Sequence, residues 1–336
     1  MSTTQEIPRI VLLKDIEEVV QQNDFAPKLM NAIAQGFVAY DQGDFCAAPI
    51  QTLGVPPFAF IAHNDPDYAG QVCVKSGYFR NTSSFVIKVA SGGHPLPNSG
   101  LLQVYSQATG KLQALLLDEG VLTEWRTAAA GSLAVTLFFA NTNTLQSIGM
   151  VGTGIQSRYQ LRMLASITQC RNVVVWGRTV AKVQAWKDEL TTEGWNVTIV
   201  DQVDDMLDLC EVIITTTCAR EPLLGTTSNQ TKPKSTHLIV CIGADAPGKQ
   251  EINQAWIQEH ANLLVADSLE QTRTRGEFQH LPSTTVIHSL GKAIQEKSLQ
   301  RQGPNDDRLI IFDSSGVALQ DCVVAQMVLD ALSTSS

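Results

Sequence analysis

The chain has 336 residues and a formal net charge of −9 at pH 7, with 44% hydrophobic and 17% charged residues. This composition is that of a folded globular protein, and the length suits two domains. The acidic balance, without any run of lysine and arginine, argues against a nucleic-acid partner, because phosphate binding needs a basic surface. No apolar run approaches the ~20 residues of a membrane-spanning helix, and the polar start lacks a signal-peptide pattern, so the sequence predicts a cytoplasmic protein without membrane contacts.

The seven cysteines and six histidines do not form a metal-binding pattern. The cysteines are widely spaced and mostly lie in apolar segments such as Leu238 to Ile242. We therefore interpret them as reduced core thiols and not as disulfide partners. Because no His-x-x-x-His or Cys-His cluster is present, no metal site is predicted.

The first 125 residues predict an antiparallel sheet with one helix, expected near Ala26 to Tyr40. Alternation of apolar and polar residues predicts strands around a turn at Ala108 to Lys111. The expected strands are Ser84 to Val89, Leu101 to Tyr105 and Leu112 to Leu117. The Ala-rich segment Thr123 to Phe139 predicts a helix that links the two halves of the chain.

From Leu145 onward, short runs rich in Val and Ile alternate with helix-like segments, which is typical of a doubly wound parallel sheet. The predicted strands are Gln146 to Val151, Asn172 to Trp176, Asn196 to Val200, Glu211 to Thr215, His237 to Ile242 and Asn262 to Ala266. The predicted helices between them are Ile155 to Ile167, Val180 to Thr192 and Asn253 to His260. A final strand at Leu309 to Ser314 precedes a helix at Val317 to Leu332, which is expected to return to the first domain.

A glycine motif follows the first of these strands. Gly152-Thr153-Gly154 stands between an apolar strand and a predicted helix. Glycines at such a turn let the backbone approach a pyrophosphate, whose charge is met by the N-terminus of the helix. The motif therefore indicates a dinucleotide site, although Ser157 occupies the place of the third glycine in the usual fingerprint.

The end of the second strand bears on which dinucleotide is bound. NAD-binding proteins usually carry a carboxylate there for the ribose 2′-hydroxyl. This chain has Trp176-Gly177-Arg178-Thr179 and no acid before Asp188. Because a guanidinium suits a 2′-phosphate, NADP(H) is favoured and NAD(H) stays open; the alternative is that Arg178 is a solvated surface residue.

Three charged residues are candidates for contact with a substrate. Asp245 follows the fifth strand and could exchange a proton with a substrate amine, or could simply cap a turn. Arg126 lies in the first turn of its helix, where its charge opposes the helix dipole, so it needs an anionic partner, either a substrate carboxylate or an acid of the chain. Lys88 is an isolated charge in an apolar strand, either a substrate contact or a solvated edge lysine.

Taken together, the motifs resemble the ornithine cyclodeaminase and mu-crystallin family. They are Arg126 to Ala130, Gly152 to Gln156, Gly243 to Lys249, Gly276-Glu277 and the closing segment Phe312 to Asp321. The resemblance runs from about Lys28 to Gln326. It implies an α/β fold in which a Rossmann-type doubly wound parallel sheet, residues 129–313, is inserted into an α+β substrate-binding and dimerisation domain. That second domain would consist of residues 1–128, with residues 314–336 returning to it.

The resemblance also implies roles for individual residues. Lys88 and Arg126 would bind the substrate carboxylate, Asp245 would handle the substrate nitrogen, and Ser315 would line the pocket; Asp245 and Lys88 are the predicted catalytic residues. The predicted dinucleotide contacts are Thr127, Gly152, Gly154, Ile155, Gln156, Arg178, Thr179 and Gly243. The segment around Arg178 is similar to the NADP-using branch of the family.

Two expected pocket positions depart from the family pattern. Gln51 stands where many members carry an arginine that also binds the carboxylate, and Gln103 stands where a threonine is common. Two cations and an amide supply less positive charge than three cations. We therefore expect weaker binding of the carboxylate and a specificity that is not for ornithine.

The function implied is that of an NAD(P)H-dependent imine or ketimine reductase, or amino-acid dehydrogenase, which transfers a hydride between nicotinamide and the α-carbon of a small amino or imino acid. A homodimer without metal is expected. One alternative is an ornithine- or lysine-type cyclodeaminase, which releases ammonia with no net change in its dinucleotide. Another is a mu-crystallin-like protein that binds a small molecule under NADP control.

Overall fold

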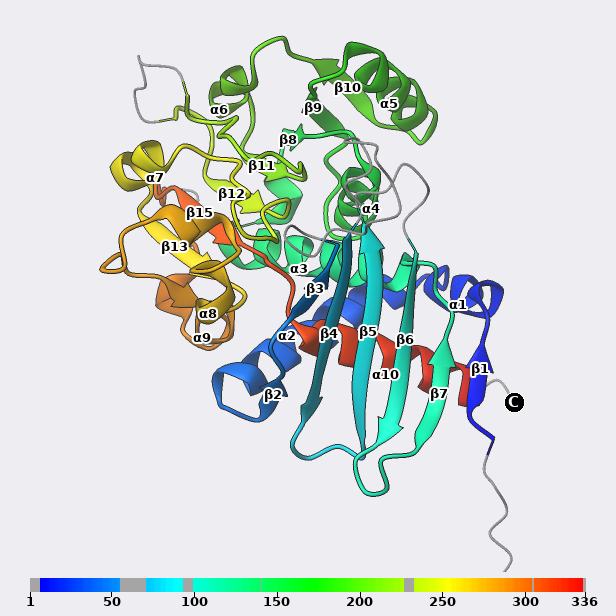
Figure 1. Ribbon diagram of the computed structural model, residues 1–336. Helices are drawn as coiled ribbons and strands as arrows, with labels where there is room; N and C mark the ends of the chain where they lie inside the picture. The colour runs from blue at the N-terminus through cyan, green and yellow to red at the C-terminus, as the bar shows by residue number, and fades with distance from the viewer. Residues whose placement is uncertain are drawn as a thin grey trace, which may run out of the picture. The chain divides into compact units, whose positions relative to one another are not determined.

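The computed structural model describes residues 7–54, 71–92, 99–139, 141–226, 233–303 and 305–334 (Figure 1). The chain divides into two compact units, Met1–Arg126 with Val317–Ser336, and Thr127–Gly316. Each unit has its own sheet. Two roles remain predictions: substrate binding and dimerisation for the first unit, and dinucleotide binding for the second.

The first unit contains a seven-stranded sheet in the order β1-β7-β6-β5-β4-β2, with β3 also paired to β4. Its strands are β1 (Arg9–Val11), β2 (Phe45–Ala47), β3 (Gln51–Leu53), β4 (Gln71–Phe79), β5 (Ser84–Gly92), β6 (Gly100–Ser106) and β7 (Leu112–Leu116). Apart from the parallel pair of β1 and β7, the neighbours are antiparallel. The helices α1 (Leu13–Val20), α2 (Phe25–Asp41) and α10 (Ala318–Thr334) belong to the same unit.

Helix α10 comes from the end of the chain and lies along one face of this sheet, where it contacts β4, β5 and α2 (Figure 1). The face that it covers is apolar because alternate residues of the strands point to it, among them Val86, Leu102 and Val104, all of which are buried. The same alternation places Lys88 on this buried face. A charged side chain is therefore held inside the apolar layer.

The second unit contains an eight-stranded parallel sheet in the order β10-β9-β8-β11-β12-β15-β13-β14. Its strands are β8 (Ile148–Val151), β9 (Asn172–Trp176), β10 (Asn196–Ile199), β11 (Val212–Thr215), β12 (Leu238–Cys241), β13 (Leu263–Ala266), β14 (His288–Ser289) and β15 (Ile310–Asp313). The chain runs outward from β8 to β10 and then returns to the other side of β8 with β11. This reversal is the switch point of a doubly wound fold, so the predicted fold class is confirmed.

The helices of the second unit connect its strands, and α3 leads into it. They are α3 (Val121–Phe138), α4 (Ile155–Leu164), α5 (Val180–Thr192), α6 (Met206–Leu209), α7 (Gln254–His260), α8 (Leu269–Thr272) and α9 (Leu290–Gln295). Strands β8, β11, β12, β13 and β15 are buried at every position, which explains their unbroken runs of apolar residues. Within the part of the chain that the structure describes, no helix is long and apolar enough to cross a membrane.

Strand β4 was not expected from the sequence. Its centre, Lys75-Ser76-Gly77, interrupts the apolar alternation by which strands are recognised. It nevertheless pairs along its length with β5 on one side and with β2 and β3 on the other. Pairing with the neighbouring strands therefore stabilises β4, although its own residues have a weak preference for strand structure.

Candidate functional site

The glycine turn lies at the switch point of the parallel sheet, directly after β8. Gly152 has φ of +105°, and a Cβ there would lie 3.0 Å from Thr216 Oγ1, so both backbone conformation and space require glycine. Gly154 is the N-cap of α4, and a Cβ added to it would have no described neighbour within 4 Å. The open side at the start of α4, which includes Ile155, suits the phosphates of a dinucleotide.

Ser157, in place of the third glycine, is fully buried in the first turn of α4. Its hydroxyl donates to the carbonyl of Gly154 at 2.6 Å and accepts from the indole nitrogen of Trp186 in α5 at 2.8 Å. Arg158 donates to the carbonyl oxygens of Thr153 and Gly154 at 3.0 and 3.1 Å. The departure from the fingerprint is thus accommodated, because these bonds fix the turn.

Two further predicted dinucleotide contacts are joined by a buried amide. Gln160 Nε2 donates to Gln156 Oε1 at 2.9 Å and to the carbonyl of Thr127 at 3.4 Å. Gln160 itself is fully buried. The structure therefore brings Thr127 and Gln156 to the same end of α4 as the glycine turn.

Arg178 and Thr179 follow β9, the strand next to β8, and both are exposed. Thr179 is the N-cap residue of α5. Among the described residues, none makes a hydrogen bond or ion pair with the Arg178 guanidinium. The side chain is exposed at the end of the strand next to the glycine turn, and its contact with a ribose 2′-phosphate stays a prediction.

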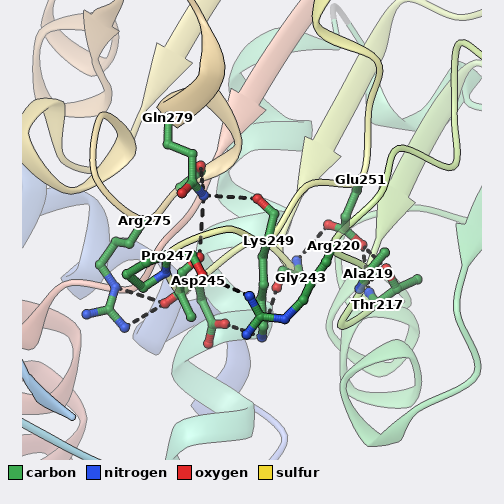
Figure 2. A network of polar contacts seen from close by, with 12 residues as sticks. Thr217, Ala219, Arg220, Gly243, Asp245, Pro247, Lys249, Glu251, Arg275 and Gln279 are labelled. Atoms are coloured by element: carbon green, nitrogen blue, oxygen red, sulfur yellow. Dashed lines mark hydrogen bonds and ion pairs between the residues drawn. The ribbon is translucent and has the colours of Figure 1, made fainter. Parts of the chain in front are cut away.

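Asp245 lies in the loop after β12, and it is held from both sides (Figure 2). Lys249 Nζ is 2.6 Å from Asp245 Oδ1. The side chain of Asp245 is 48% exposed, and that of Lys249 is 16% exposed. Arg275 donates to the backbone carbonyl of Asp245 from Nε and Nη2 at 2.8 and 2.6 Å. Lys249 thus holds the carboxylate of Asp245 and Arg275 holds its backbone, and neither cation was expected here from the sequence.

A buried carboxylate network ties this loop to the sheet. Glu251, fully buried, accepts hydrogen bonds from Thr215 Oγ1 (2.6 Å), from the backbone and hydroxyl of Thr217 (2.7 and 2.8 Å) and from Gly243 N (2.9 Å). Glu277 accepts from the backbone amides of Glu251 and Ile252 at 3.0 and 2.7 Å. Burial raises the pKa of Glu251, and burial together with repulsion from Glu251 raises the pKa of Glu277 well above its ordinary value.

Gly243, another predicted dinucleotide contact, is required for this network. A Cβ at Gly243 would lie 2.1 Å from the carbonyl oxygen of Thr217, so no larger residue fits. Its backbone amide already donates to Glu251. A contact from Gly243 to a ligand would therefore be made by its Cα and not by its amide.

Ser315 is buried at the end of β15. Its hydroxyl donates to Asp267 Oδ1 at 3.0 Å and lies 3.2 Å from Gln271 Oε1. Asp267 Oδ2 also accepts from the backbone amide of Gly316 at 2.8 Å. These contacts anchor the segment after β15, and a substrate contact from Ser315 stays a prediction.

The first unit brings together Lys88 of β5 and Arg126 of α3, with Asp321 of α10 between them. Lys88 Nζ is 2.7 Å from Asp321 Oδ1, Arg126 Nε is 3.2 Å from the same oxygen, and all three side chains are at most 6% exposed. Gln320 completes the cluster, because Arg126 Nη1 donates to its Oε1 at 3.2 Å and its Nε2 donates to the Arg126 carbonyl at 3.1 Å. The acid of the chain that Arg126 could pair with is therefore Asp321.

The charges in this cluster do not balance. Two cations share one carboxylate oxygen, and Asp321 Oδ2 accepts no hydrogen bond from any described residue. Burial acts to raise the pKa of Asp321, but Lys88 and Arg126 outweigh it and hold that pKa below its ordinary value. Burial and the neighbouring Arg126 lower the pKa of Lys88. Such a surplus of buried positive charge favours a further anion at this place.

Gln51 and Gln103 are not brought to this cluster. Gln51 is exposed and pairs with Val74, whereas the next residue of β4, Lys75, pairs with Lys88. Because successive strand residues point to opposite faces, Gln51 lies on the face away from Lys88. Gln103 pairs with Ile87, also on the far face, and accepts a hydrogen bond from Tyr105 Oη at 2.6 Å. The expectation that these two amides line the carboxylate site is therefore not supported by the first unit.

Some of the charged partners that were not predicted lie within the sequence motifs. Asp321 and Lys249 both stand inside the quoted motifs, and a carboxylate or cation there could have been tested as a partner of the opposite charges nearby. Arg275 carried no such signal, because it acts on the backbone of Asp245, a residue 30 positions away in the sequence.

The fold defines a class of protein: a Rossmann-type sheet with a glycine turn after its first strand, in one chain with an α+β unit that holds a buried cluster of two cations and one carboxylate. Residues 11–336 match the ornithine cyclodeaminase/mu-crystallin family, and the chain belongs to that family. The resemblance noted from the motifs is thereby confirmed.

The names of similar proteins refer to different activities. The chain is 32% identical over 276 residues to an uncharacterized cyclodeaminase of Sinorhizobium fredii, covering 78% of this chain and 80% of that one. It is 28% identical over 280 residues to the iminosuccinate reductase of Paracoccus denitrificans, covering 80% and 82%. The structure of an archaeal alanine dehydrogenase dimer with bound NAD matches with a TM-score of 0.78 at 24% identity, covering 98% of this chain and 97% of that one, which shows a shared fold.

Proposed function

We propose that the protein is an NAD(P)H-dependent imine or ketimine reductase, with amino-acid dehydrogenation as the reverse reaction. The observation that carries the proposal is the pair of buried cations, Lys88 and Arg126, that share the single carboxylate oxygen of Asp321. A substrate carboxylate would supply the missing negative charge, and its binding would orient the α-carbon. The family membership and the glycine turn support a dinucleotide as the hydride carrier.

The residues around the glycine turn fit a dinucleotide. Gly154 and Ile155 form an open start to α4 directly after the turn at Gly152, and Arg178 follows the neighbouring strand. We propose NADP(H) over NAD(H), because a 2′-phosphate would pair with the exposed Arg178. A bound NAD(P)H supplies the hydride that reduces the imine carbon.

Asp245 would hold a proton at the substrate nitrogen. A protonated imine is a better hydride acceptor, so an acid held at that nitrogen lowers the barrier. Lys249 binds Oδ1 of Asp245 and Arg275 fixes its backbone, so the second carboxylate oxygen keeps a defined direction. Lys88 and Arg126 would bind the carboxylate of the same substrate.

Steady-state oxidation of NADPH and NADH should be measured with cyclic imines, and with 2-oxo acids supplied together with ammonia or methylamine. We expect imine-dependent oxidation, faster with NADPH. Ammonia release from ornithine or lysine without net oxidation would overturn the proposal in favour of a cyclodeaminase. Dinucleotide binding without either reaction would favour a binding protein of the mu-crystallin type.

We also propose that the protein is a homodimer, as the archaeal alanine dehydrogenase structure is. Its mass in solution, measured by light scattering, should be about twice that of the 36.5 kDa chain. A monomeric mass at micromolar concentration would contradict this assignment.

A further inference from the structure

The loop after β12 that carries Asp245 lies outside the sheet. Residues 245–250 belong to no strand or helix, and Gly248 has a φ of +77°. Within the loop, the amide of Lys249 donates to the carbonyl of Ala246 at 3.2 Å. Backbone groups outside a strand or helix need partners elsewhere, so the shape of this loop depends on the side chains that bind it.

One side chain, that of Gln279, binds this loop at three places. Its Oε1 accepts from the amide of Gly248 at 2.8 Å. Its Nε2 donates to the carbonyl oxygens of Lys249 at 2.9 Å and of Ala246 at 3.4 Å. Nε2 also donates to the carbonyl of Gly276, in its own segment, at 2.9 Å. A single amide thus supplies both the acceptor and the donors that a neighbouring strand would otherwise supply.

The segment that carries Gln279 binds the same stretch of chain at two further places. Arg275, four residues earlier, donates to the carbonyl of Asp245 from two nitrogen atoms. Glu277, which is buried, accepts from the backbone amides of residues 251–252, directly after the loop. Three alternate residues of one segment therefore hold consecutive parts of the chain around Asp245.

Lys249 connects Gln279 to the carboxylate of Asp245 (Figure 2). Gln279 binds the carbonyl of Lys249, and the other end of that residue, Nζ, is 2.6 Å from Asp245 Oδ1. A shift of ~1 Å in a reacting group can lower a rate by about 10²-fold. We propose that Gln279 is a positioning residue, which fixes where Asp245 presents its proton and does not itself touch the substrate. This inference rests on the proposed function, because it deepens the role of Asp245 in that reaction.

The first test removes the hydrogen bonds and keeps the length of the side chain. Gln279→Met should lower kcat for imine reduction by about 10- to 10²-fold, while the dissociation constants of NADPH and NADH change by less than about 2-fold. Dinucleotide affinity that falls as much as kcat would show that Gln279 serves the folding of the second unit, against the proposal.

Gln279→Glu makes the same contacts depend on pH. As a carboxylic acid, the new side chain can accept from Gly248 and donate to the carbonyl of Lys249; as a carboxylate it has no proton to donate and repels that oxygen. The ionisable side chains beside it, those of Asp245, Lys249 and Arg275, are the same in both proteins. The kcat of this variant relative to the unaltered protein should therefore rise by at least ~5-fold between about pH 8 and about pH 5.5.

Two further ratios complete the pH series. The relative kcat of Gln279→Met should not change with pH, because methionine does not titrate. Gln258→Glu, at an exposed position of α7 in the same unit, adds the same charge and should match the unaltered protein at every pH. A relative kcat of Gln279→Glu that stays constant with pH would overturn the proposal and leave the proposed function standing.

Hydrogen exchange tests the hold on the loop without any turnover. Peptides that cover residues 245–252 should exchange at least ~10-fold faster in Gln279→Met than in the unaltered protein, and those of β8 should not change. Unchanged exchange in the loop would overturn the inference, whatever the assays show. Faster exchange in a protein that reduces no imine would contradict the proposed function and with it the catalytic role of Gln279, which separates that failure from a failure of the hydrogen bonds.

Discussion

Two side chains of the second unit, Arg178 and Asp245, are predicted to meet a ligand directly. Arg178 is exposed beside the glycine turn, and within the described ranges nothing pairs with it. Asp245 has one carboxylate oxygen bound by Lys249 and a backbone fixed by Arg275. Both side chains lie at the surface of the second unit, so substitutions there are expected to change specificity or rate before they change stability.

The cofactor preference should depend on Arg178. We expect Arg178→Ala to weaken NADPH binding by about 1.5–3 kcal/mol, the scale of a charge-assisted contact, with little change for NADH. Dissociation constants for both dinucleotides, measured by fluorescence titration, check this. Equal losses for the two dinucleotides would remove the argument for NADP(H).

The catalytic group should be Asp245, positioned by Lys249. Asp245→Asn should lower kcat by roughly 10²-fold or more and leave dinucleotide affinity nearly unchanged. Lys249→Met should instead shift the pH dependence of kcat/KM upward, because a cation beside a carboxylate favours its charged form. Lys249→Arg should restore the original profile; a profile that is identical in all three proteins would show that Asp245 is only a loop residue.

At the scale of elements, buried carboxylates join the ends of the parallel strands. Glu251 links β11 and β12 through Thr215 and Gly243, and Glu277 binds the backbone that carries Glu251. The loop that positions Asp245 is therefore held by groups that never need to touch a ligand. Because they are buried, their protonation contributes to stability.

Glu277 should make the folded protein less stable as the pH rises. Folding raises its pKa above the ordinary value of about 4.3, so its contribution is complete below that pH and is lost as the pH rises toward the folded pKa. The Glu277→Gln variant has no carboxylate to bury. The difference between its Tm and that of the unaltered protein should therefore grow in its favour as the pH rises from about 5 to 8. Exposed Glu221→Gln serves as the control, and parallel Tm curves for all three proteins would contradict this role.

At the scale of the whole molecule, the end of the chain completes the first unit. Asp321 of α10 meets Lys88, 233 residues earlier, and α10 also buries Leu319, Val324 and Val328. The second unit occupies the sequence between these partners. The cluster of Lys88, Arg126 and Asp321 therefore forms only after the C-terminal helix has packed against the first unit's sheet.

Asp321→Asn should destabilise the protein by about 3–5 kcal/mol, because it leaves two buried cations without their shared anion. Urea unfolding followed by circular dichroism measures the loss. Asp330→Asn, exposed near the end of the same helix, should change stability by less than about 0.5 kcal/mol. A similar small change for Asp321→Asn would mean that the cluster contributes no net stability.

The sequence by itself determined the parallel sheet, the glycine turn and the family. Strands such as β8 and β12 are buried on both faces, so their apolar runs are continuous and visible without neighbours. The turn at Gly152 is also visible locally, because a backbone φ of +105° favours glycine whatever residues surround it. Arg126 was also recognised as needing an anion, since its place in the helix is a local property.

Only the tertiary structure decided which charges meet. Strand β4, the opposition of Lys75 and Lys88, and the outward face of Gln51 all follow from strand register, which one sequence does not encode locally. The choice of Asp321 as the shared acid required α10 to return across the sheet. Long-range pairing therefore decides which charged side chains become neighbours, because a sheet brings together residues that lie far apart along the chain.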